Sequence, residues 1–173
     1  MARIPSKVQR RETYIERIKP FMRTNAVKVM IGHRRVGKSY ILYQLINLIK
    51  EEEKDANIIY INKEDLEFEF IANYRDLYAY VKERLVDEHR NYIFVDEIQE
   101  ITDFRLAIRS LALDENNDIY ITGSNSEMFS SDLANELGGR YVEFKIFSLS
   151  YLEFLQFHQL PNDDESLEKY IHF

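Results

Sequence analysis

The residues that could do chemistry begin with a glycine-rich stretch. A short, mainly apolar stretch with Val27, Val29, Met30 and Ile31 ends at Gly32. That glycine opens the spacing G-x-x-x-x-G-K-S, which closes with Gly37, Lys38 and Ser39. Glycines let such a loop turn so that successive backbone N–H groups face phosphate oxygens. A lysine at this spacing can reach the β- and γ-phosphates, and a serine hydroxyl can hold Mg²⁺. The pattern therefore predicts a phosphate-binding P-loop, the Walker A motif.

The surroundings of the loop support this interpretation. Apolar residues at helical spacing follow Ser39 at once, so strand, glycine loop and helix come in the order that a P-loop requires. A chance glycine–lysine turn is the alternative, and the flanking elements argue against it. Arg34 and Arg35 make the loop more basic, or else they face solvent. The residues expected to contact nucleotide are Gly32, His33, Arg34, Arg35, Val36, Gly37, Lys38, Ser39 and Tyr40.

Two acids, Asp96 and Glu97, directly follow another apolar run, residues 92–95. Asp96, at the mouth of a buried strand, would hold Mg²⁺ opposite Ser39. Glu97 would take a proton from the attacking water as a general base. Acids also end strands simply because loops are polar. One strand–helix unit separates this pair from the glycine loop, however, which is the arrangement of a Walker B motif.

Three further polar residues are candidates for the same chemistry. Ser124 or Asn125, after the strand expected over residues 118–122, could orient the attacking water, although Gly-Ser-Asn is also a good turn. Arg140 follows a glycine pair and could complete a neighbouring subunit's site by stabilising the transferring phosphoryl group. Pairing with a surface acid is the equal alternative for Arg140.

A guanine-reading motif is the one signal that we reject. Residues 62–65 read Asn-Lys-Glu-Asp, which fits the N-K-x-D of GTPases. In that family the motif lies far downstream of the magnesium-binding aspartate, which is followed by x-x-Gly. Here it precedes Asp96, and Gln99 stands at the place of that glycine. We interpret it as a coincidence in a loop, which favours ATP over GTP.

Alternating strands and helices must position these residues. Strands are expected over residues 27–31, 57–61, 91–95, 118–122 and 141–147, the last of them near an edge. Expected helices begin at a capping box formed by Ser6 and Gln9, after the glycine loop, near residue 74, at an N-cap Thr102, near residue 127 and at a second capping box formed by Ser150 and Glu153. This alternation predicts an α/β fold with a parallel sheet between two layers of helices.

The chain of 173 residues fits one domain. We expect a helix and lead-in over residues 1–26, the P-loop sheet over 27–147, and a C-terminal helical region that starts at 148–173 and is cut short. No signal-peptide pattern is present, and no apolar run approaches the ~20 residues of a membrane span. Cysteine is absent. We therefore expect a cytoplasmic protein without a membrane segment.

Charge is unevenly distributed along the chain. Residues 1–40 hold eleven lysines and arginines against two glutamates, whereas the whole chain has a net charge of −7. Part of this basic excess belongs to the glycine loop. The rest, on residues 3–28, could touch nucleic acid or an acidic protein partner. A solvated basic helix face is the alternative that we prefer.

Several segments resemble one family, and together they extend over nearly the whole chain. They are Gly-His-Arg-Arg-Val-Gly-Lys-Ser, Phe-Val-Asp-Glu-Ile-Gln-Glu, Ile-Thr-Gly-Ser-Asn, Leu-Gly-Gly-Arg-Tyr and Phe-Ser-Leu-Ser-Tyr-Leu-Glu-Phe-Leu. In order and wording they resemble the predicted AAA+-type P-loop ATPases of bacteria and archaea, in the ASCE group. Family members usually continue into a C-terminal domain, which we expect to be missing from this chain.

The resemblance implies a fold and a set of roles. The fold is a three-layer P-loop NTPase with a five-stranded parallel sheet of order 5-1-4-3-2. The roles are magnesium ligand for Asp96, catalytic base for Glu97, sensor for Ser124 or Asn125, and a finger for Arg140 that acts in trans within a homo-oligomer.

We expect ATP binding and Mg²⁺-dependent ATP hydrolysis, coupled to an unidentified partner. Two alternatives stay open: a nucleotide-binding switch with little or no turnover, and a P-loop kinase for a small molecule. Glu97 argues against the kinase, since a water-activating base serves hydrolysis and must be avoided in transfer to a substrate. Nothing in the sequence separates the hydrolase from the slow switch.

Overall fold

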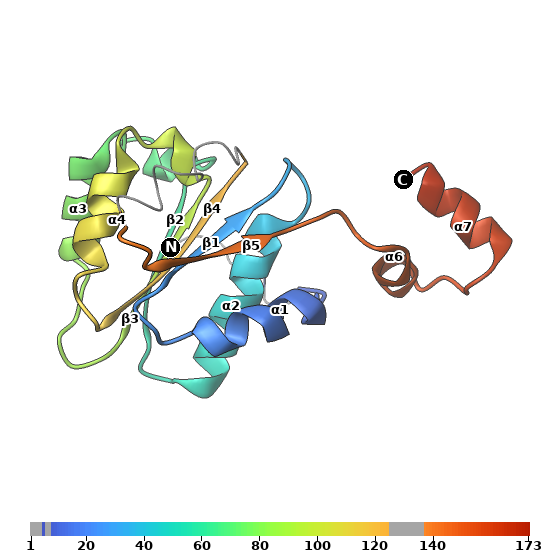
Figure 1. Cartoon of the computed structure of the whole chain (residues 1–173), viewed down its shortest axis with the longest axis horizontal. Coiled ribbons are helices and arrows are strands. Elements are labelled where there is room, and N and C mark those ends of the chain that lie inside the picture. Colours follow the sequence, from blue (N-terminus) through green and yellow to red (C-terminus); the bar gives the residue numbers. More distant parts are fainter. Residues whose placement is uncertain (1–4, 6–7, 125–136) are drawn as a thin grey trace.

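A five-stranded parallel sheet forms the centre of the protein (Figure 1). The computed structural model describes residue 5 and residues 8–124 and 137–173. The strands are β1 (Val27–Ile31), β2 (Asn57–Asn62), β3 (Asn91–Asp96), β4 (Asn117–Gly123) and β5 (Tyr141–Lys145). Their order is β2-β3-β4-β1-β5, and every neighbouring pair is parallel. The expected sheet order is thus confirmed, and β5 lies at an edge.

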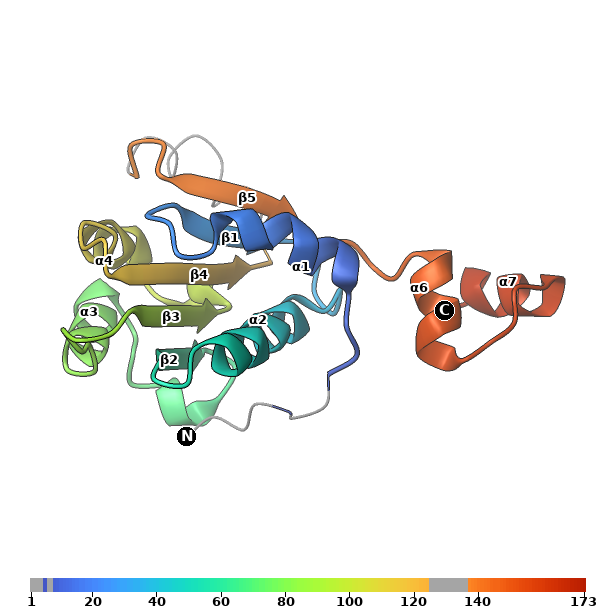
Figure 2. The same cartoon turned by 90° about the horizontal axis from the view of Figure 1, so that it is seen from below.

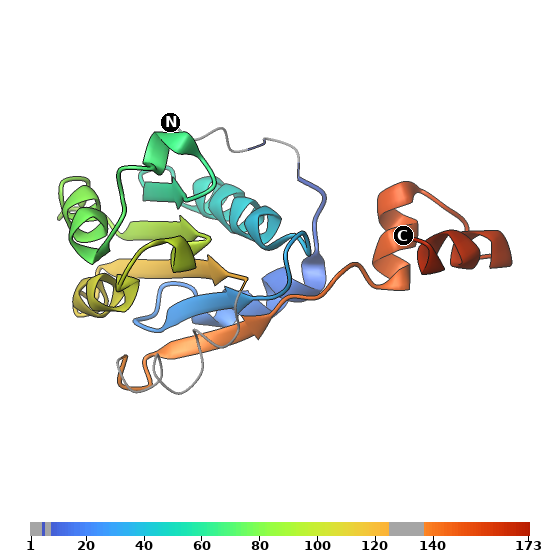
Figure 3. The same cartoon turned by 90° about the horizontal axis from the view of Figure 1, so that it is seen from above.

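Helices cover both faces of the sheet, so the fold has three layers. One face carries α1 (Glu12–Ile18) and α2 (Lys38–Glu52), and the other carries α3 (Tyr74–Lys82) and α4 (Phe104–Leu111) (Figures 2 and 3). Short 3-10 helices occur at Lys19–Phe21, Leu66–Phe68 and Ile98–Glu100. The three-layer α/β architecture agrees with the expectation from the sequence.

The strands present different apolar side chains to the two helical layers, because successive side chains of a strand point to opposite faces. Toward α3 and α4 they contribute isoleucine and valine, namely Val29, Ile61, Ile93, Val95, Ile119 and Ile121. Toward α1 and α2 they contribute mainly aromatic rings, namely Tyr60, Tyr92, Phe94, Tyr120 and Phe144. Burial on both faces explains why apolar residues occupy successive positions in the central strands.

The first helix begins later than the sequence pattern suggested. We predicted a capping box at Ser6 and Gln9, but α1 begins at Glu12, and Ser6 lies outside the described residues. Arg11 has a non-helical backbone, with φ −105° and ψ 74°. Its N–H donates to the Gln44 side chain on α2 at 2.8 Å. Packing against α2 therefore decides where α1 starts, and the local pattern does not.

The predicted N-cap of α4 is also wrong. Thr102 instead bridges to Asn73, ahead of α3. Its N–H donates to the Ala72 carbonyl, and its own carbonyl accepts from the Tyr74 N–H. Asp103 takes the cap position with φ 54°, without a side-chain capping bond. The helix expected over residues 127–137 lies almost wholly outside the described residues.

Two helices follow β5, where the sequence suggested one. Ser150 and Glu153 form the predicted capping box of α6 (Tyr151–His158). A second helix, α7 (Asp164–Ile171), starts after Asp163, whose side chain caps it. Both helices lie beyond the carboxyl edge of the sheet, to the side of the main body (Figure 2).

An ion pair between Lys28 on β1 and Asp118 on β4 is fully buried. The ammonium also donates to two backbone carbonyls, and the carboxylate also accepts from the Arg23 N–H and the Tyr120 hydroxyl. Burial lowers the pKa of Lys28, and the Asp118 charge opposes that shift. Loss of one partner would leave an uncompensated buried charge.

We expect Asp118→Ala to lower the free energy of unfolding by about 3–5 kcal/mol, measured by urea unfolding, because Lys28 then stays buried without its partner. Glu165→Ala, which breaks the exposed pair of Glu165 with Lys169, is the control. Its free energy of unfolding should fall far less, because solvent screens exposed ion pairs. Equal losses for the two variants would contradict the role given to the buried pair.

Candidate functional site

The glycine loop joins the carboxyl end of β1 to α2. Gly37 is the N-cap of α2 and has φ +94°, in the left-handed region that favours glycine, as the sequence suggested. Gly32 differs from that expectation, because its φ lies outside this region. A Cβ at Gly32 would lie 2.3 Å from the Ile146 carbonyl oxygen. This glycine is required because the chain after β5 passes directly over the loop.

Lys38 is buried within the loop that precedes it. Its Nζ donates to the carbonyl oxygens of Gly32 and His33, each at 3.1 Å. It also lies 3.2 Å from Glu97 Oε1. Val36 is buried as well. The predicted contact residues that are exposed are His33, Arg34, Arg35 and Tyr40.

Asp96 lies at the end of β3 and is almost completely buried. It accepts hydrogen bonds from the Thr122 hydroxyl at 2.5 Å and the Tyr60 hydroxyl at 3.2 Å. The side chain of Ser39 is also hydrogen-bonded to it. Burial raises the pKa of Asp96, and the hydrogen bonds from Ser39 and Thr122 oppose the rise. The structure thus brings together the two residues that the sequence proposed as magnesium ligands.

Glu97 has a left-handed backbone, with φ 54° and ψ 50°, which is uncommon for a residue other than glycine. Its N–H donates to the Thr122 hydroxyl oxygen at 2.9 Å. Its carboxylate accepts from Ser124 Oγ and Gln99 Nε2 and faces Lys38. Burial would raise the pKa of Glu97, but these three partners together hold it below its ordinary value. Glu97 is therefore ionised at neutral pH.

Thr122 and Tyr60 are site residues that the sequence reasoning missed. Thr122 is fully buried on β4, beside β3, and its hydroxyl contacts Asp96 and the Glu97 N–H. The only signal for it was its place two residues before Ser124 in the segment Ile-Thr-Gly-Ser. Tyr60 comes from β2, and no pattern in the sequence linked that strand to the acids.

The other candidates lie in different places. Ser124 reaches Glu97 directly, whereas Asn125 lies outside the described residues. Arg140 is exposed, and its carbonyl accepts from the N–H of Val27, the first residue of β1. The glycine loop follows the last residue of that strand. At about 3.3 Å per residue, the Arg140 backbone and the start of the glycine loop therefore lie on the order of 15 Å apart.

The donor set suits Mg²⁺ bound together with phosphates. No cluster of three or more His, Cys, Asp or Glu within the described residues could hold a metal by itself. Magnesium commonly takes one or two protein oxygens and fills its shell with phosphates and water. The adjoining oxygens of Ser39 and Asp96 fit this pattern.

A cavity of about 760 Å³ adjoins the outer side of the glycine loop. Its walls come from the loop, the start of α2, the segment before α1, and the helices α6 and α7. The lining includes Val8, Tyr40, Leu149, Phe157, Tyr170 and Phe173. Its size and mixed lining are typical of small-molecule sites.

The sheet order, the glycine loop after β1 and the acids at the end of β3 together define a P-loop NTPase of the α/β class. A family model described as an AAA domain matches residues 24–155, so the chain belongs to this family. The resemblance seen in the sequence is thereby confirmed. Membership places the chain among ATP-binding domains of the ATPase type.

Two relatives are described as uncharacterized proteins. One, from Haemophilus influenzae, is 34% identical over 161 residues, which are 92% of this chain and 40% of that protein. The other, from Methanocaldococcus jannaschii, is 38% identical over 133 residues, which are 77% of this chain and 29% of that protein. The chain thus spans well under half the length of either relative.

Solved structures share the fold at low sequence identity. ORC1 of Aeropyrum pernix, solved in complex with DNA, superposes with a TM-score of 0.65 and 13% identity, over 96% of this chain and 51% of that one. Cdc6p of Pyrobaculum aerophilum superposes with a TM-score of 0.63 and 12% identity, over 91% of this chain and 50% of that one. Hsp104 of Saccharomyces cerevisiae, in a casein complex, superposes with a TM-score of 0.61 and 16% identity, over 88% of this chain and 29% of that one.

Within residues 8–124 and 137–173, no helix has the length and apolar character needed to cross a membrane.

The buried Asp96 predicts an unusual dependence of stability on pH. Because the pKa of Asp96 is raised in the folded protein, the folded state holds more protons than the unfolded chain between the ordinary and the raised pKa. Stability without ligands therefore falls as pH rises through this window. We expect Asp96→Asn to increase the free energy of unfolding at neutral pH and to remove this slope.

Urea unfolding without nucleotide or metal, from about pH 4 to about pH 8, measures both effects. Asp55→Asn, at an exposed position, is the control and should leave the slope unchanged. A loss of stability in Asp96→Asn at neutral pH would show that ionising this carboxyl does not destabilise the fold.

Proposed function

We propose that this chain is an ATP-binding core that hydrolyses ATP with Mg²⁺ and couples hydrolysis to a partner. One observation carries the proposal. Lys38, Ser39, Asp96 and Glu97 gather at the carboxyl edge of the sheet, joined by an ion pair and hydrogen bonds. A glycine loop, a lysine, a magnesium-binding pair and a base are the parts that phosphoryl transfer to water needs.

The loop and Lys38 would bind the phosphates. The Gly37 N-cap presents the free N–H groups at the start of α2, where anions are favoured. Lys38 adds a charge already held by the Gly32 and His33 carbonyls, so little side-chain entropy remains to be lost. Ser39 and Asp96 would hold Mg²⁺, which when bound neutralises charge on the phosphates.

Glu97 would accept the proton of the attacking water. The left-handed backbone and the Thr122 bond turn its carboxylate toward Lys38, beside the phosphate end of the loop. Ser124, bonded to the same carboxylate, would orient the water. Asn125 stays a prediction for this role.

The cavity beside the loop would take the nucleoside. It borders Gly37 and Tyr40, so a nucleotide whose phosphates occupy the loop has room there for its base. The Asn-Lys-Glu-Asp stretch is not part of this wall. Its Lys63 Nζ donates to the Phe68 carbonyl within its own loop, after β2, and β3 and β4 separate β2 from β1. This supports ATP rather than GTP.

A nucleotide switch with slow turnover is the second candidate. The observation in its favour is the lowered pKa of Glu97, because a carboxylate stabilised by Ser124, Gln99 and Lys38 is a weaker base. The kinase alternative has no such support, since Glu97 lies where it would activate water.

The partner is not identified by the basic N-terminal segment. Arg11, Arg23 and Lys28 each pair with an acid of this chain, as do the exposed Arg10 and Lys19. Much of the positive charge is therefore neutralised within the molecule. This argues against a nucleic-acid surface on this segment.

Two variants test hydrolysis against binding. Glu97→Gln should still bind ATP and Mg²⁺, but hydrolysis should fall by roughly 10²–10⁴, because the amide cannot accept the proton. Lys38→Ala should instead lose ATP affinity, because its charge no longer meets the phosphates. Calorimetry and a phosphate-release assay separate the effects. Wild-type turnover by Glu97→Gln would favour another base. ATP binding by Lys38→Ala as tight as that of the wild type would contradict the P-loop assignment.

The position of Arg140 predicts that it acts on a second copy of the chain. It is exposed at the end of β1 opposite the loop, so its own site is out of reach. A finger supplied in trans is worth roughly 10³–10⁵ in kcat. Turnover should therefore rise more steeply than linearly with protein concentration and collapse in Arg140→Ala.

Mixing Arg140→Ala with Lys38→Ala separates a finger from a surface residue. The first variant keeps a sound loop and the second keeps a sound arginine, so mixed assemblies should recover activity that neither has alone. If Arg140→Ala alone keeps full turnover, or an assembled mixture stays inactive, the trans mechanism is wrong.

A further inference from the structure

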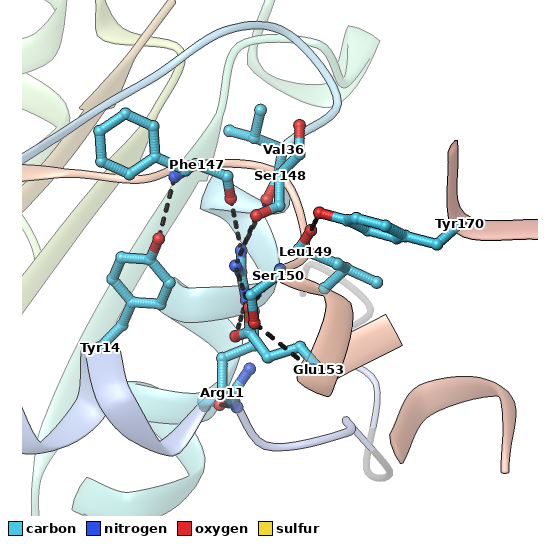
Figure 4. Close-up of polar contacts among 10 residues, drawn as sticks. Arg11, Tyr14, Val36, Phe147, Ser148, Leu149, Ser150, Glu153 and Tyr170 are labelled. Atoms are coloured by element: carbon cyan, nitrogen blue, oxygen red, sulfur yellow. Dashed lines mark hydrogen bonds and ion pairs between the residues drawn. The ribbon is translucent and has the colours of Figure 1, made fainter. Parts of the chain in front are cut away.

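Arg11 is a buried charged side chain, with only 3% of its surface exposed. It precedes α1 and lies between the glycine loop, the segment that follows β5, and α6 (Figure 4). The guanidinium also sits over the Tyr14 ring, 4.5 Å from its centroid. A basic residue so deeply placed must have its donors satisfied, and here each nitrogen is.

One guanidinium nitrogen holds the glycine loop. Nη1 donates to the Val36 carbonyl at 2.9 Å. The C=O and N–H of a trans peptide point in opposite directions, so this bond turns the Gly37 N–H away from Arg11. Gly37 is the N-cap of α2, and its backbone direction sets where the first N–H groups of the helix point. Arg11 thus fixes the end of the loop that would meet phosphate.

The remaining contacts hold the segment after β5 and the first turn of α6. Nη1 also donates to the Phe147 carbonyl at 3.0 Å, and Nη2 donates to the Ser148 carbonyl at 3.3 Å. Nε and Nη2 form a two-point bond with the Glu153 carboxylate, at 2.9 and 3.1 Å. Burial would raise the pKa of Glu153, but the bonds from Arg11 and Ser150 hold it low, so the pair is charged.

The same segment touches the other end of the loop. The Ile146 carbonyl occupies the space that a side chain at Gly32 would need. The Phe147 N–H donates to the Tyr14 hydroxyl at 3.0 Å, beside Arg11. The segment after β5 therefore contacts the glycine loop at both ends. Ile146 packs directly against the start of the loop, and residues 147–153 are linked to Val36, near its end, through Arg11.

We propose that Arg11 is a positioning residue that couples nucleotide binding in the glycine loop to the placement of α6 and α7. This inference rests on the proposed nucleotide site. Helix α6 cannot shift without breaking the Glu153 bond or pulling Arg11 from Val36. Helix α7 is linked to this contact through α6, because its Tyr170 ring packs against the rings of Tyr151 and Phe154. Reciprocally, nucleotide that orders the loop favours the arrangement in which Arg11 holds α6, because coupling between two sites acts in both directions. Lysine cannot replace the Arg11 guanidinium, because an ammonium group is a single point charge and cannot bind all these acceptors in the same geometry.

Affinity for ADP with Mg²⁺, measured by calorimetry, is the first test. Arg11→Lys should raise the Kd by roughly 5- to 150-fold, the range of typical coupling between sites. Glu153→Gln, at the surface end of the pair, should also raise it. The double variant should bind no more weakly than Arg11→Lys alone, because both changes break one connection. Arg10→Ala, an exposed neighbour with its own ion pair to Glu51, is the matched control and should bind like wild type.

Hydrogen exchange separates coupling from mere structural support. In wild type, saturating ADP with Mg²⁺ should slow exchange of the amides over residues 147–158, and in Arg10→Ala it should do the same. In Arg11→Lys and Glu153→Gln, at saturating ADP, this protection should be lost. Unchanged protection in both variants would overturn the coupling while leaving the nucleotide site intact. A wild-type protein that does not bind ADP would overturn the proposed function itself. Glu153→Gln keeps the test decisive should Arg11→Lys not fold.

Discussion

The parallel register of β1, β3 and β4 is the constraint on which the site depends. Val95 pairs with Ile121, and Ile31 pairs with Gly123. Three strands therefore end at nearly the same level, so the glycine loop, the two acids and the hydroxyls at the end of β4 meet without any long connection. The same geometry sends the opposite ends of the strands, with Arg140, to the far edge. A slip in this register would turn each side chain of the moved strand to the other face.

Two adjacent carboxyl groups acquire opposite properties at this edge. Asp96 continues the buried strand, and burial raises its pKa. Glu97 leaves the strand through a left-handed turn and meets Ser124, Gln99 and Lys38, which lower its pKa. The Thr122 hydroxyl contacts both residues. One poorly solvated acid suited to a cation and one ionised acid near the loop lysine thus come from a single dipeptide, because the backbone turns between them.

The chain segments that precede and follow the sheet in the sequence both contact the glycine loop. The chain before α1 supplies Arg11, and the chain after β5 supplies the Ile146 carbonyl and Glu153. None of these groups belongs to a nucleotide-binding motif. They account for two features of the loop that a motif leaves unexplained: why Gly32 has no room for a side chain, and what holds the Val36 carbonyl. The loop is thus a tertiary structure as well as a sequence pattern.

The strands, the glycine loop and the acids could be predicted from the sequence, because strand burial and motif spacing are local properties of the chain. The order of the strands followed from the family resemblance. Prediction from the sequence failed where a distant contact outweighed a local pattern: α1 starts at Glu12 after Arg11 binds Gln44, and Thr102 bridges toward α3 instead of capping α4. Only the tertiary structure brought Thr122, Tyr60 and Arg11 to the site, because each acts through neighbours that lie 25 or more positions away along the chain. Such contacts follow from strand register and helix packing, which no single stretch of residues encodes.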